Sequence, residues 1–285
     1  MDLCNLSVIK SVMADAGITF RKEFGQNFLI NRIIPEEIAD NCADTAERMI
    51  LEIGPGIGCL TQELAMRYKK VVAVEIDRGL IPVLSKTLAD FDNITVINDD
   101  IMKVDLRALI DEYSEGMPVS VCANLPYYIT TPILMRLLES DVKLSSITVM
   151  VQNEVATRLA AKEGSADYGA ITAVLGYYGS VRRLFKVSAG CFVPAPKVDS
   201  AVVRIDLYDK PPFEIKDEKL FFNLIKAAFE MRRKTLQNAI SAKLPTYSKE
   251  KITEAIAAIG KDEKVRGERL STEDFANLAN YLSEN

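Results

Sequence analysis

Polar side chains stand at the ends of four short apolar runs, and their types suit the binding of a nucleoside. Glu52, Glu75, Asp100 and Asn124 occupy these positions. Because the carboxyl ends of parallel strands meet at one edge of a sheet, the four side chains should face one ligand. A carboxylate after the second strand can accept hydrogen bonds from both ribose hydroxyls, and one after the third can accept from an adenine amine. We assign these roles to Glu75 and Asp100, although any one such residue could equally be a helix cap.

Three glycines follow the first of these runs at every second position. Gly54, Gly56 and Gly58 lie between a predicted strand that ends near Ile53 and a predicted helix that begins near Cys59. Glycine is needed where the backbone takes a positive φ or where a ligand approaches closely. A structural turn or another nucleotide loop could contain the same cluster. The G-x-G-x-G spacing after an acidic residue resembles the first motif of S-adenosylmethionine-dependent methyltransferases rather than the G-x-G-x-x-G dinucleotide fingerprint.

The tetrapeptide Asn124-Leu125-Pro126-Tyr127 carries groups that could activate an exocyclic amine. The lone pair of an adenine amine is delocalised into the ring, so this amine is a poor nucleophile. Two acceptors that hold its protons out of the ring plane, the Asn124 side-chain oxygen and the Pro126 carbonyl, would localise the pair on nitrogen. Tyr127 could stack on the base. The tetrapeptide could also be only a turn after a strand, but the glycine loop upstream favours the catalytic interpretation.

The composition excludes several other kinds of chemistry. The chain has 285 residues, 48% of them hydrophobic, which is enough for one large and one small domain. It contains no histidine, which excludes Ser-His-Asp and Cys-His nucleophiles and histidine-ligated metals. Its five cysteines are far apart, so neither a disulfide framework nor a C-x-x-C metal site is indicated. We expect no bound metal.

Charge and hydropathy limit the location and partners of the protein. No stretch is long and apolar enough to span a membrane, and the amino terminus lacks the apolar region of a signal peptide. We therefore expect a cytoplasmic protein with no membrane partner. The sequence is silent on quaternary structure, for which we expect a monomer. The net charge of −5 argues mildly against a nucleic-acid partner, but clustering of basic residues on one face matters more than the total.

Strands that alternate with helices should position the polar residues. Strand-like runs occur at 49–53, 71–76, 93–97, 119–123, 146–151, 181–187 and 200–207. The last two follow each other closely enough to pair antiparallel at one edge. This pattern predicts an α/β fold, a Rossmann-like doubly wound sheet of seven strands of the class I methyltransferase type.

The proline pair at 211–212 marks a domain boundary, because no strand-like run follows it. We assign residues 1–208 to the methyltransferase domain, with an amino-terminal arm at 1–34, and residues 209–285 to a small helical RNA-binding domain. Helical periodicity in the second domain predicts helices at 220–229, 235–241, 249–259 and 272–282. In the arm, residues 7–16 predict a short helix on the surface.

Taken together, the motifs resemble the KsgA/RsmA family, which dimethylates two adjacent adenosines near the 3′ end of small-subunit (16S) ribosomal RNA with S-adenosylmethionine as methyl donor. The similarity covers nearly the whole chain. The matching segments are residues 24–29, 52–58, 75–77, 100, 124–127, 192–203 and 232–236. The F-x-P-x-P-K-V-D-S run at 192–200 is the most restrictive of them. The sequence departs from the family pattern at Asp99 and Ala123, where glycine is common.

The resemblance implies roles for individual residues. It implies that the cofactor is held by Gln26, Asn27, Leu29, Gly54, Gly56, Glu75, Ile76, Asp100, Ile101 and Asn124. It implies that the target base is received by Asn124, Pro126, Tyr127 and Phe192. From the residues alone, Phe192 could equally be a core aromatic, although Pro194 and Pro196 favour a rigid loop that presents its ring.

Three consecutive basic residues, Arg232, Arg233 and Lys234, predict contacts with RNA phosphates. Such a run is more often a solvated helix face. An acidic protein must concentrate its positive charge to hold RNA, which favours phosphate contacts here. Further contacts are expected from Arg21, Lys22, Arg182 and Arg183.

Four other functions fit parts of the sequence. A related enzyme that dimethylates adenine in large-subunit ribosomal RNA, or a DNA adenine methyltransferase, would share the amine chemistry, but the F-x-P-x-P-K-V-D-S run argues against both. A ribosome-assembly factor would depend on RNA binding more than on catalysis. A nicotinamide-dependent dehydrogenase fits poorly, because the glycine motif lacks its sixth position and no histidine can donate a proton.

Overall fold

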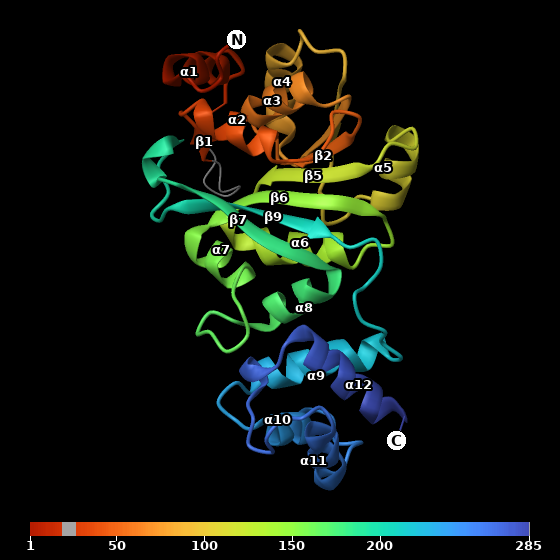
Figure 1. The fold of residues 1–285 in the computed structure, drawn as a ribbon. Coiled ribbons are helices and arrows are strands. Elements are labelled where there is room, and N and C mark those ends of the chain that lie inside the picture. The colour runs from red at the N-terminus through yellow and green to blue at the C-terminus, as the bar shows by residue number, and fades with distance from the viewer. Residues whose placement is uncertain (19–26, 285) are drawn as a thin grey trace. The chain divides into compact units, whose positions relative to one another are not determined.

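A seven-stranded sheet forms the centre of the protein, whose computed structural model describes residues 1–18 and 27–284 (Figure 1). Across the sheet the strands follow the order β4 (Ile94–Asn98), β3 (Lys70–Glu75), β2 (Met49–Ile53), β5 (Val119–Asn124), β6 (Leu144–Gln152), β9 (Ser200–Leu207) and β7 (Gly179–Val187). The first five run parallel to one another, and β9 pairs antiparallel with β6. The predicted α/β class and the seven strands are confirmed, with the last two at one edge.

The central strands are parallel because their sequences are apolar on both faces. Every residue of β2 is buried, and so are five of the six residues of β3 and of β5. A strand that is buried on both sides needs helices on both faces of its sheet. These helices are α2 (Ile33–Asp40), α3 (Cys59–Arg67), α4 (Ile81–Thr87), α5 (Leu106–Tyr113), α6 (Thr130–Leu138) and α7 (Asn153–Leu159).

Helix packing and a short pair of strands attach the amino-terminal arm to the domain. Helix α1 (Leu6–Asp15) buries Ile9, Val12 and Met13 in an apolar cluster. This cluster also contains Phe28 of the arm and Ile57 of the glycine loop. The arm helix therefore has a buried face and does not simply lie on the surface. Strand β1 (Phe28–Leu29) pairs antiparallel with β8 (Phe192–Val193), which places Leu29 opposite Phe192.

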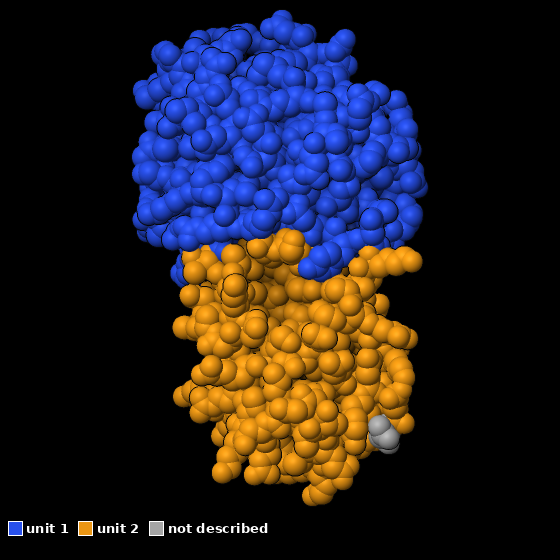
Figure 2. Space-filling view, in the orientation of Figure 1, with its two compact units in different colours: residues 1–156, 182–209 blue, residues 157–181, 210–285 orange. Residues whose placement is uncertain are grey.

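The chain divides into two compact units, residues 1–156 with 182–209 and residues 157–181 with 210–285 (Figure 2). The division after 209 lies one residue from the predicted boundary. Residues 157–181, which we placed in the first domain from the sequence, group instead with the carboxyl-terminal helices. These are α9 (Glu218–Glu230), α10 (Leu236–Lys243), α11 (Lys249–Ala258) and α12 (Thr272–Glu284), close to the four predicted helices.

Helix α8 (Ala170–Tyr178) explains this grouping. Its apolar sequence packs against the carboxyl-terminal helices: the rings of Tyr177 and Phe221 lie 5.4 Å apart, and the Tyr177 hydroxyl donates to Glu218 at 2.7 Å. The Thr272 hydroxyl donates to the Ala173 carbonyl at 2.9 Å. The residues between β6 and β7 thus contribute one helix to the core of the second unit.

Candidate functional site

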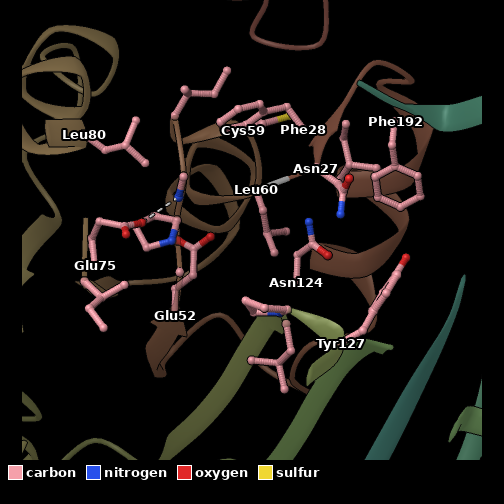
Figure 3. Close-up of a pocket in the computed structure, with 18 residues that line it drawn as sticks. Asn27, Phe28, Glu52, Cys59, Leu60, Glu75, Leu80, Asn124, Tyr127 and Phe192 are labelled. Carbon is pink, nitrogen blue, oxygen red and sulfur yellow. Dashed lines mark hydrogen bonds between the residues drawn. The ribbon is translucent and has the colours of Figure 1, made fainter. Parts of the chain in front are cut away.

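A pocket of about 880 Å³, including its open mouth, lies at the carboxyl ends of the central strands (Figure 3). Its lining comes from the arm, the glycine loop, the ends of β2, β3 and β5, and β8. The lining residues are Asn27, Phe28, Leu29, Glu52, Gly54, Pro55, Gly56, Ile57, Cys59, Leu60, Glu75, Ile76, Leu80, Asn124, Leu125, Pro126, Tyr127 and Phe192. The predicted meeting of strand ends at one rim is therefore present for Glu52, Glu75 and Asn124.

The glycine loop forms one wall of the pocket and has no room for side chains. Gly56 has a φ of 62°, and a Cβ atom there would lie 3.2 Å from Cε1 of Phe28. Gly58 has a φ of 94° and is the N-cap of α3, where a Cβ atom would lie 2.9 Å from Leu88. Both positions combine a left-handed backbone with close neighbours, so only glycine fits without strain.

Glu75 is fixed by the backbone of the glycine loop. Its Oε2 accepts a hydrogen bond from the Gly56 N–H at 3.1 Å, and its Oε1 accepts from the Asp77 N–H at 2.7 Å. Burial raises the pKa of this carboxyl, while the two backbone donors oppose the change. Each oxygen keeps acceptor capacity toward the pocket, which suits a pair of ribose hydroxyls.

Glu52 is a buried carboxylate whose environment is incomplete. It is 1% exposed, and its Oε2 has no hydrogen-bond partner among the described residues. The hydroxyl of buried Thr61 on α3 is likewise without a partner there. Burial has the largest effect and raises the pKa of Glu52 to about 8. The Thr61 side chain opposes this shift, and the negative charge of Glu75 adds to it. A buried oxygen at a pocket wall that has no partner in the described chain is available to a water molecule or a bound ligand.

Asp100 and Ile101 do not line the pocket in this structure. They begin the turn after β4, and the Asp100 carboxylate accepts from the Met102 N–H at 2.9 Å and lies 3.6 Å from the Lys103 ammonium. The turn is nevertheless tied to the pocket, because the Asp99 N–H donates to the carbonyl of Glu75 at 3.1 Å. Their adenine-binding role stays a prediction.

The predicted target-base residues gather at the other end of the pocket. Figure 3 shows Asn124, Tyr127 and Phe192 on the side away from Glu75, with the Asn124 amide directed into the cavity. The Tyr127 hydroxyl and Ser200 Oγ lie 2.6 Å apart, which fixes the ring of Tyr127. Phe192 is only 3% exposed and belongs to the core, yet it also lines the pocket. Phe192 is thus a core aromatic at the pocket wall, and its stacking on the target base stays a prediction.

The carbonyl of Pro126 already has local donors. It accepts from the Ile129 N–H at 3.2 Å and from the Thr130 hydroxyl at 3.3 Å, both long hydrogen bonds. A substrate amine would have to share this oxygen with them or displace the hydroxyl of Thr130. The Asn124 side-chain oxygen is consequently the stronger of the two predicted acceptors.

Gln26, one of the predicted cofactor residues, lies outside the described residues. The other predicted cofactor residues line the pocket, except for Asp100 and Ile101, which lie in the turn after β4. Sequence reasoning assigned no role to seven further lining residues, which are Phe28, Pro55, Ile57, Cys59, Leu60, Leu80 and Leu125. Phe28 could have been recognised because it belongs to the F-G-Q-N-F-L segment that carries the resemblance. The apolar residues Leu60 and Leu80 have no sequence signal that separates lining from core.

The predicted RNA-binding run lies in the second unit, in the turn between α9 and α10 and not on a helix face. Arg233 and Lys234 are exposed. Arg232 instead pairs with Glu268 at 2.8 Å and donates to the carbonyl of Ala166 at 2.7 Å. Of the accessory residues in the described chain, Arg182 pairs with Asp206 at 2.9 Å.

Residues 1–18 and 27–284 contain neither a membrane-spanning helix nor a metal site. No helix there is long and apolar enough to cross a bilayer. No cluster of three or more cysteine, aspartate or glutamate side chains there could hold a metal ion.

Comparison with known proteins decides the family. Residues 17–284 match the sequence profile of the family described as ribosomal RNA adenine dimethylase. The chain belongs to this family. The ribosomal RNA adenine dimethylase fold explains the pocket, in which an acidic strand end, a glycine loop and an Asn-Leu-Pro-Tyr turn share one cavity. Membership makes the chain a ribosomal RNA adenine methyltransferase, with a cofactor of the S-adenosylmethionine type and an RNA substrate.

Relatives named ribosomal RNA small subunit methyltransferase A resemble the chain over nearly its full length. The protein from Alkaliphilus metalliredigens is 47% identical, and the match covers 97% of this chain and 96% of the relative. The protein from Bacillus mycoides is 45% identical, with coverage of 99% and 97%. The expected family resemblance is thus confirmed.

Two solved structures share the fold of this dimethylase. A dimethyladenosine transferase from Plasmodium falciparum superposes with a TM-score of 0.78 at 24% identity, covering 90% of this chain and 97% of that one. The 23S rRNA methyltransferase ErmE superposes with a TM-score of 0.71 at 26% identity, covering 90% of this chain and all of that one. The class I methyltransferase fold is therefore confirmed.

Proposed function

We propose that the protein transfers methyl groups from S-adenosylmethionine to the exocyclic amines of two adjacent adenosines near the 3′ end of 16S ribosomal RNA, as a cytoplasmic monomer that acts in small-subunit biogenesis. The observation that carries the proposal is the cavity shared by Glu75 and Asn124. One end offers acceptors suited to a ribose, and the other offers an amide suited to an aromatic amine. The names of the relatives that match nearly the whole chain support the small subunit as the target.

The pocket suits S-adenosylmethionine, whose role when bound is to supply an electrophilic methyl group. Glu75 holds the two ribose hydroxyls, and the absence of side chains at Gly54 and Gly56 leaves room along the loop. Asp100 and Ile101 recognise the adenine, and Asn27, Leu29 and Ile76 close over the ligand with Gln26. Glu52 lacks a partner among the described residues, and a cationic part of the cofactor would supply it.

Asn124 prepares the target amine. Its side-chain oxygen would accept a hydrogen bond from one N–H of the amine, and the Pro126 carbonyl would accept from the other. The nitrogen lone pair would then leave conjugation and could attack the methyl carbon as the bond between that carbon and sulfur breaks. Tyr127 and Phe192 hold the base between them. The alkylated nitrogen is positively charged and acidic, so it loses its proton to water without a general base.

The principal rival is a large-subunit target, since ErmE shares the fold. Its identity of 26% is well below the 45% to 47% of the small-subunit relatives. The other rival, an assembly factor with little catalysis, would not need the buried acceptors at Glu52 and Glu75.

Transfer of labelled methyl from S-adenosylmethionine to unmethylated small subunits, with unmethylated large subunits as control, tests the proposal. We expect label only in the small subunit and only in dimethyladenosine. Asn124→Ala should cut transfer by a factor of about 10²–10³ while it leaves cofactor binding nearly unchanged. Label in the large subunit alone, or equal rates for wild type and Asn124→Ala, would contradict the proposal.

A further inference from the structure

The guanidinium of Arg136 holds the turn that follows β4. Arg136 lies in the last turn of α6. Its Nε donates to the carbonyl of Ile101 at 2.9 Å, and its Nη2 donates to the carbonyl of Val104 at 2.5 Å. These donors lie on one edge of a planar, permanently charged group, and hydrogen bonds from such a group are stronger than neutral ones. One side chain thus fixes two carbonyls of a single turn.

The same turn determines where the Asp100 carboxylate points. Oδ1 of Asp100 accepts from the Met102 N–H at 2.9 Å, and the Asp100 carbonyl accepts from the N–H groups of Lys103 and Val104 at 2.7 and 2.9 Å. A rotation of the turn would therefore move both the carboxylate and the backbone of Ile101. Arg136 is a cationic side chain that restrains such a rotation from outside the turn.

Helix α6 also reaches the target-base end of the pocket. It begins at Thr130, whose hydroxyl donates to the carbonyl of Pro126 at 3.3 Å. The first turn of the helix contacts the group that should receive the amine, and its last turn grips the turn of Asp100. Since a short helix is a rigid spacer, the two ends are held at a fixed separation.

We propose that Arg136 is a positioning residue for cofactor recognition: by holding the carbonyls of Ile101 and Val104, it sets the turn so that Asp100 and Ile101 can read the adenine base of the cofactor. The inference rests on the proposed function, which assigns adenine to those two residues. Lysine would not replace it, because a single ammonium on a flexible stem cannot hold two carbonyls in a fixed plane.

The test compares two ligands that differ only in the base. Binding of S-adenosylhomocysteine and of its inosine analogue, in which oxygen replaces the 6-amino group, is measured by calorimetry. Wild type should bind the adenine ligand more tightly than the inosine analogue. The Asp100 carboxylate can accept a hydrogen bond from the 6-amino group of adenine, and the analogue has no donor at this position. Arg136→Met should weaken the adenine ligand by about tenfold and the analogue by less than about twofold, so the preference is lost. The preference of Arg136→Lys for the adenine ligand should lie between that of wild type and that of Arg136→Met.

Matched variants separate positioning from damage to the fold. Arg107→Met removes another arginine that lines the same groove as Arg136 and whose side chain donates to the carbonyl of Asp141 rather than to the Asp100 turn. It should leave both affinities unchanged. In the double variant Arg136→Met with Asp100→Ala, the loss of affinity for the adenine ligand should be smaller than the sum of the two single losses, because Arg136 acts through the turn that holds Asp100.

The outcomes are distinct. Equal weakening of both ligands by Arg136→Met, or additive losses in the double variant, would show that Arg136 only stabilises the fold and would overturn the inference. If Asp100→Ala binds both ligands as wild type does, the adenine assignment of the proposed function fails, and the inference fails with it. If Asp100→Ala loses the preference for the adenine ligand and both Arg136 variants keep it, the inference about Arg136 is overturned, while the proposed function stands.

Discussion

Two carboxylates in one pocket differ in what the protein provides for them. Glu75 accepts hydrogen bonds from two backbone N–H groups, whereas the Oε2 of Glu52 has no partner in the described chain. A carboxylate with donors stays ionised more easily than one without. Glu75 can therefore accept from neutral hydroxyls, whereas Glu52, whose pKa of about 8 leaves it largely protonated at neutral pH, would ionise beside a ligand that brings positive charge.

Replacement of Glu75 should remove ribose recognition. Glu75→Ala loses charge-assisted hydrogen bonds, so we expect cofactor binding to weaken by about 2–4 kcal/mol. Isothermal calorimetry with S-adenosylhomocysteine measures this, and thermal unfolding checks the fold. Glu47→Ala, which removes an exposed carboxylate paired with Lys69, is the control and should bind as wild type does. Unchanged affinity in Glu75→Ala would remove Glu75 from the site.

The raised pKa of Glu52, about 8, has a consequence for stability. Because this pKa is higher in the folded than in the unfolded chain, the folded protein binds more protons between about pH 4.5 and 8, and the free energy of unfolding falls as the pH rises through this range. Urea unfolding of the ligand-free protein at pH 5.5 and 8 measures the slope. Glu52→Gln should flatten it, whereas equal slopes would show that Glu52 is already ionised.

At the scale of elements, α8 joins the second unit through a contact too close for a side chain. A Cβ atom on Gly176 would lie 2.3 Å from the hydroxyl oxygen of Thr272 on α12. This contact explains why a glycine interrupts an otherwise apolar helix. The stability gained from close packing of α8 on α12 exceeds the stability lost through the low helix propensity of glycine.

Gly176→Ala should therefore destabilise the protein even though alanine favours helices by about 1 kcal/mol over glycine. Overpacking costs about 1–3 kcal/mol, so we expect a net loss of up to about 2 kcal/mol. Chemical unfolding gives the value. Gly190→Ala, where the nearest atom to a Cβ is 3.8 Å away, serves as control and should change little. A more stable Gly176→Ala variant would contradict this account of the helix contact.

The elements that sequence could predict are those whose signal is local. Strands β2, β3 and β5 were predicted within a residue or two because their runs are continuous and apolar. Strands β1 and β8 have two residues each and pair across most of the chain, so no local pattern marks them. The predicted helix at 235–241 matches α10 because its start carries a local signal, Thr235, which caps the helix by accepting from the Asn238 N–H.

The site divides in the same way. Glu75, Asn124 and Tyr127 were predicted from strand ends and one motif, and the pocket contains all three. The unsatisfied environment of Glu52 could not be predicted, because it depends on which donors fail to reach a buried oxygen. The contact between Arg136 and the Asp100 turn was equally invisible, since 35 residues separate Arg136 from Ile101.

At the scale of the whole molecule, an acidic protein with net charge −5 must bind RNA through local clusters. Arg233 and Lys234 are exposed, while Arg232 is engaged with Glu268. The double change Arg233→Ala with Lys234→Ala should reduce the slope of log K against log[salt] by about 2, through loss of two phosphate contacts. Filter binding to small-subunit RNA at several salt concentrations measures it.

Arg232→Ala is the comparison for this run. It should lower stability through loss of the Glu268 pair and leave the salt slope closer to that of wild type. S-adenosylhomocysteine binding should stay the same in the double variant. An unchanged salt slope in the double variant would mean that RNA docks elsewhere on the chain.

The second unit is built from two separate stretches of the chain, residues 157–181 and 210–285, and this has a consequence while the chain is being synthesised. Helix α8 emerges from the ribosome well before α9 and α12, which cover its apolar face. At typical elongation rates the delay between Tyr178 and Thr272 is on the order of 10 s. During that interval the nascent protein presents an uncovered hydrophobic helix to chaperones and to neighbouring chains, and a chain that stops near residue 209 would present it permanently.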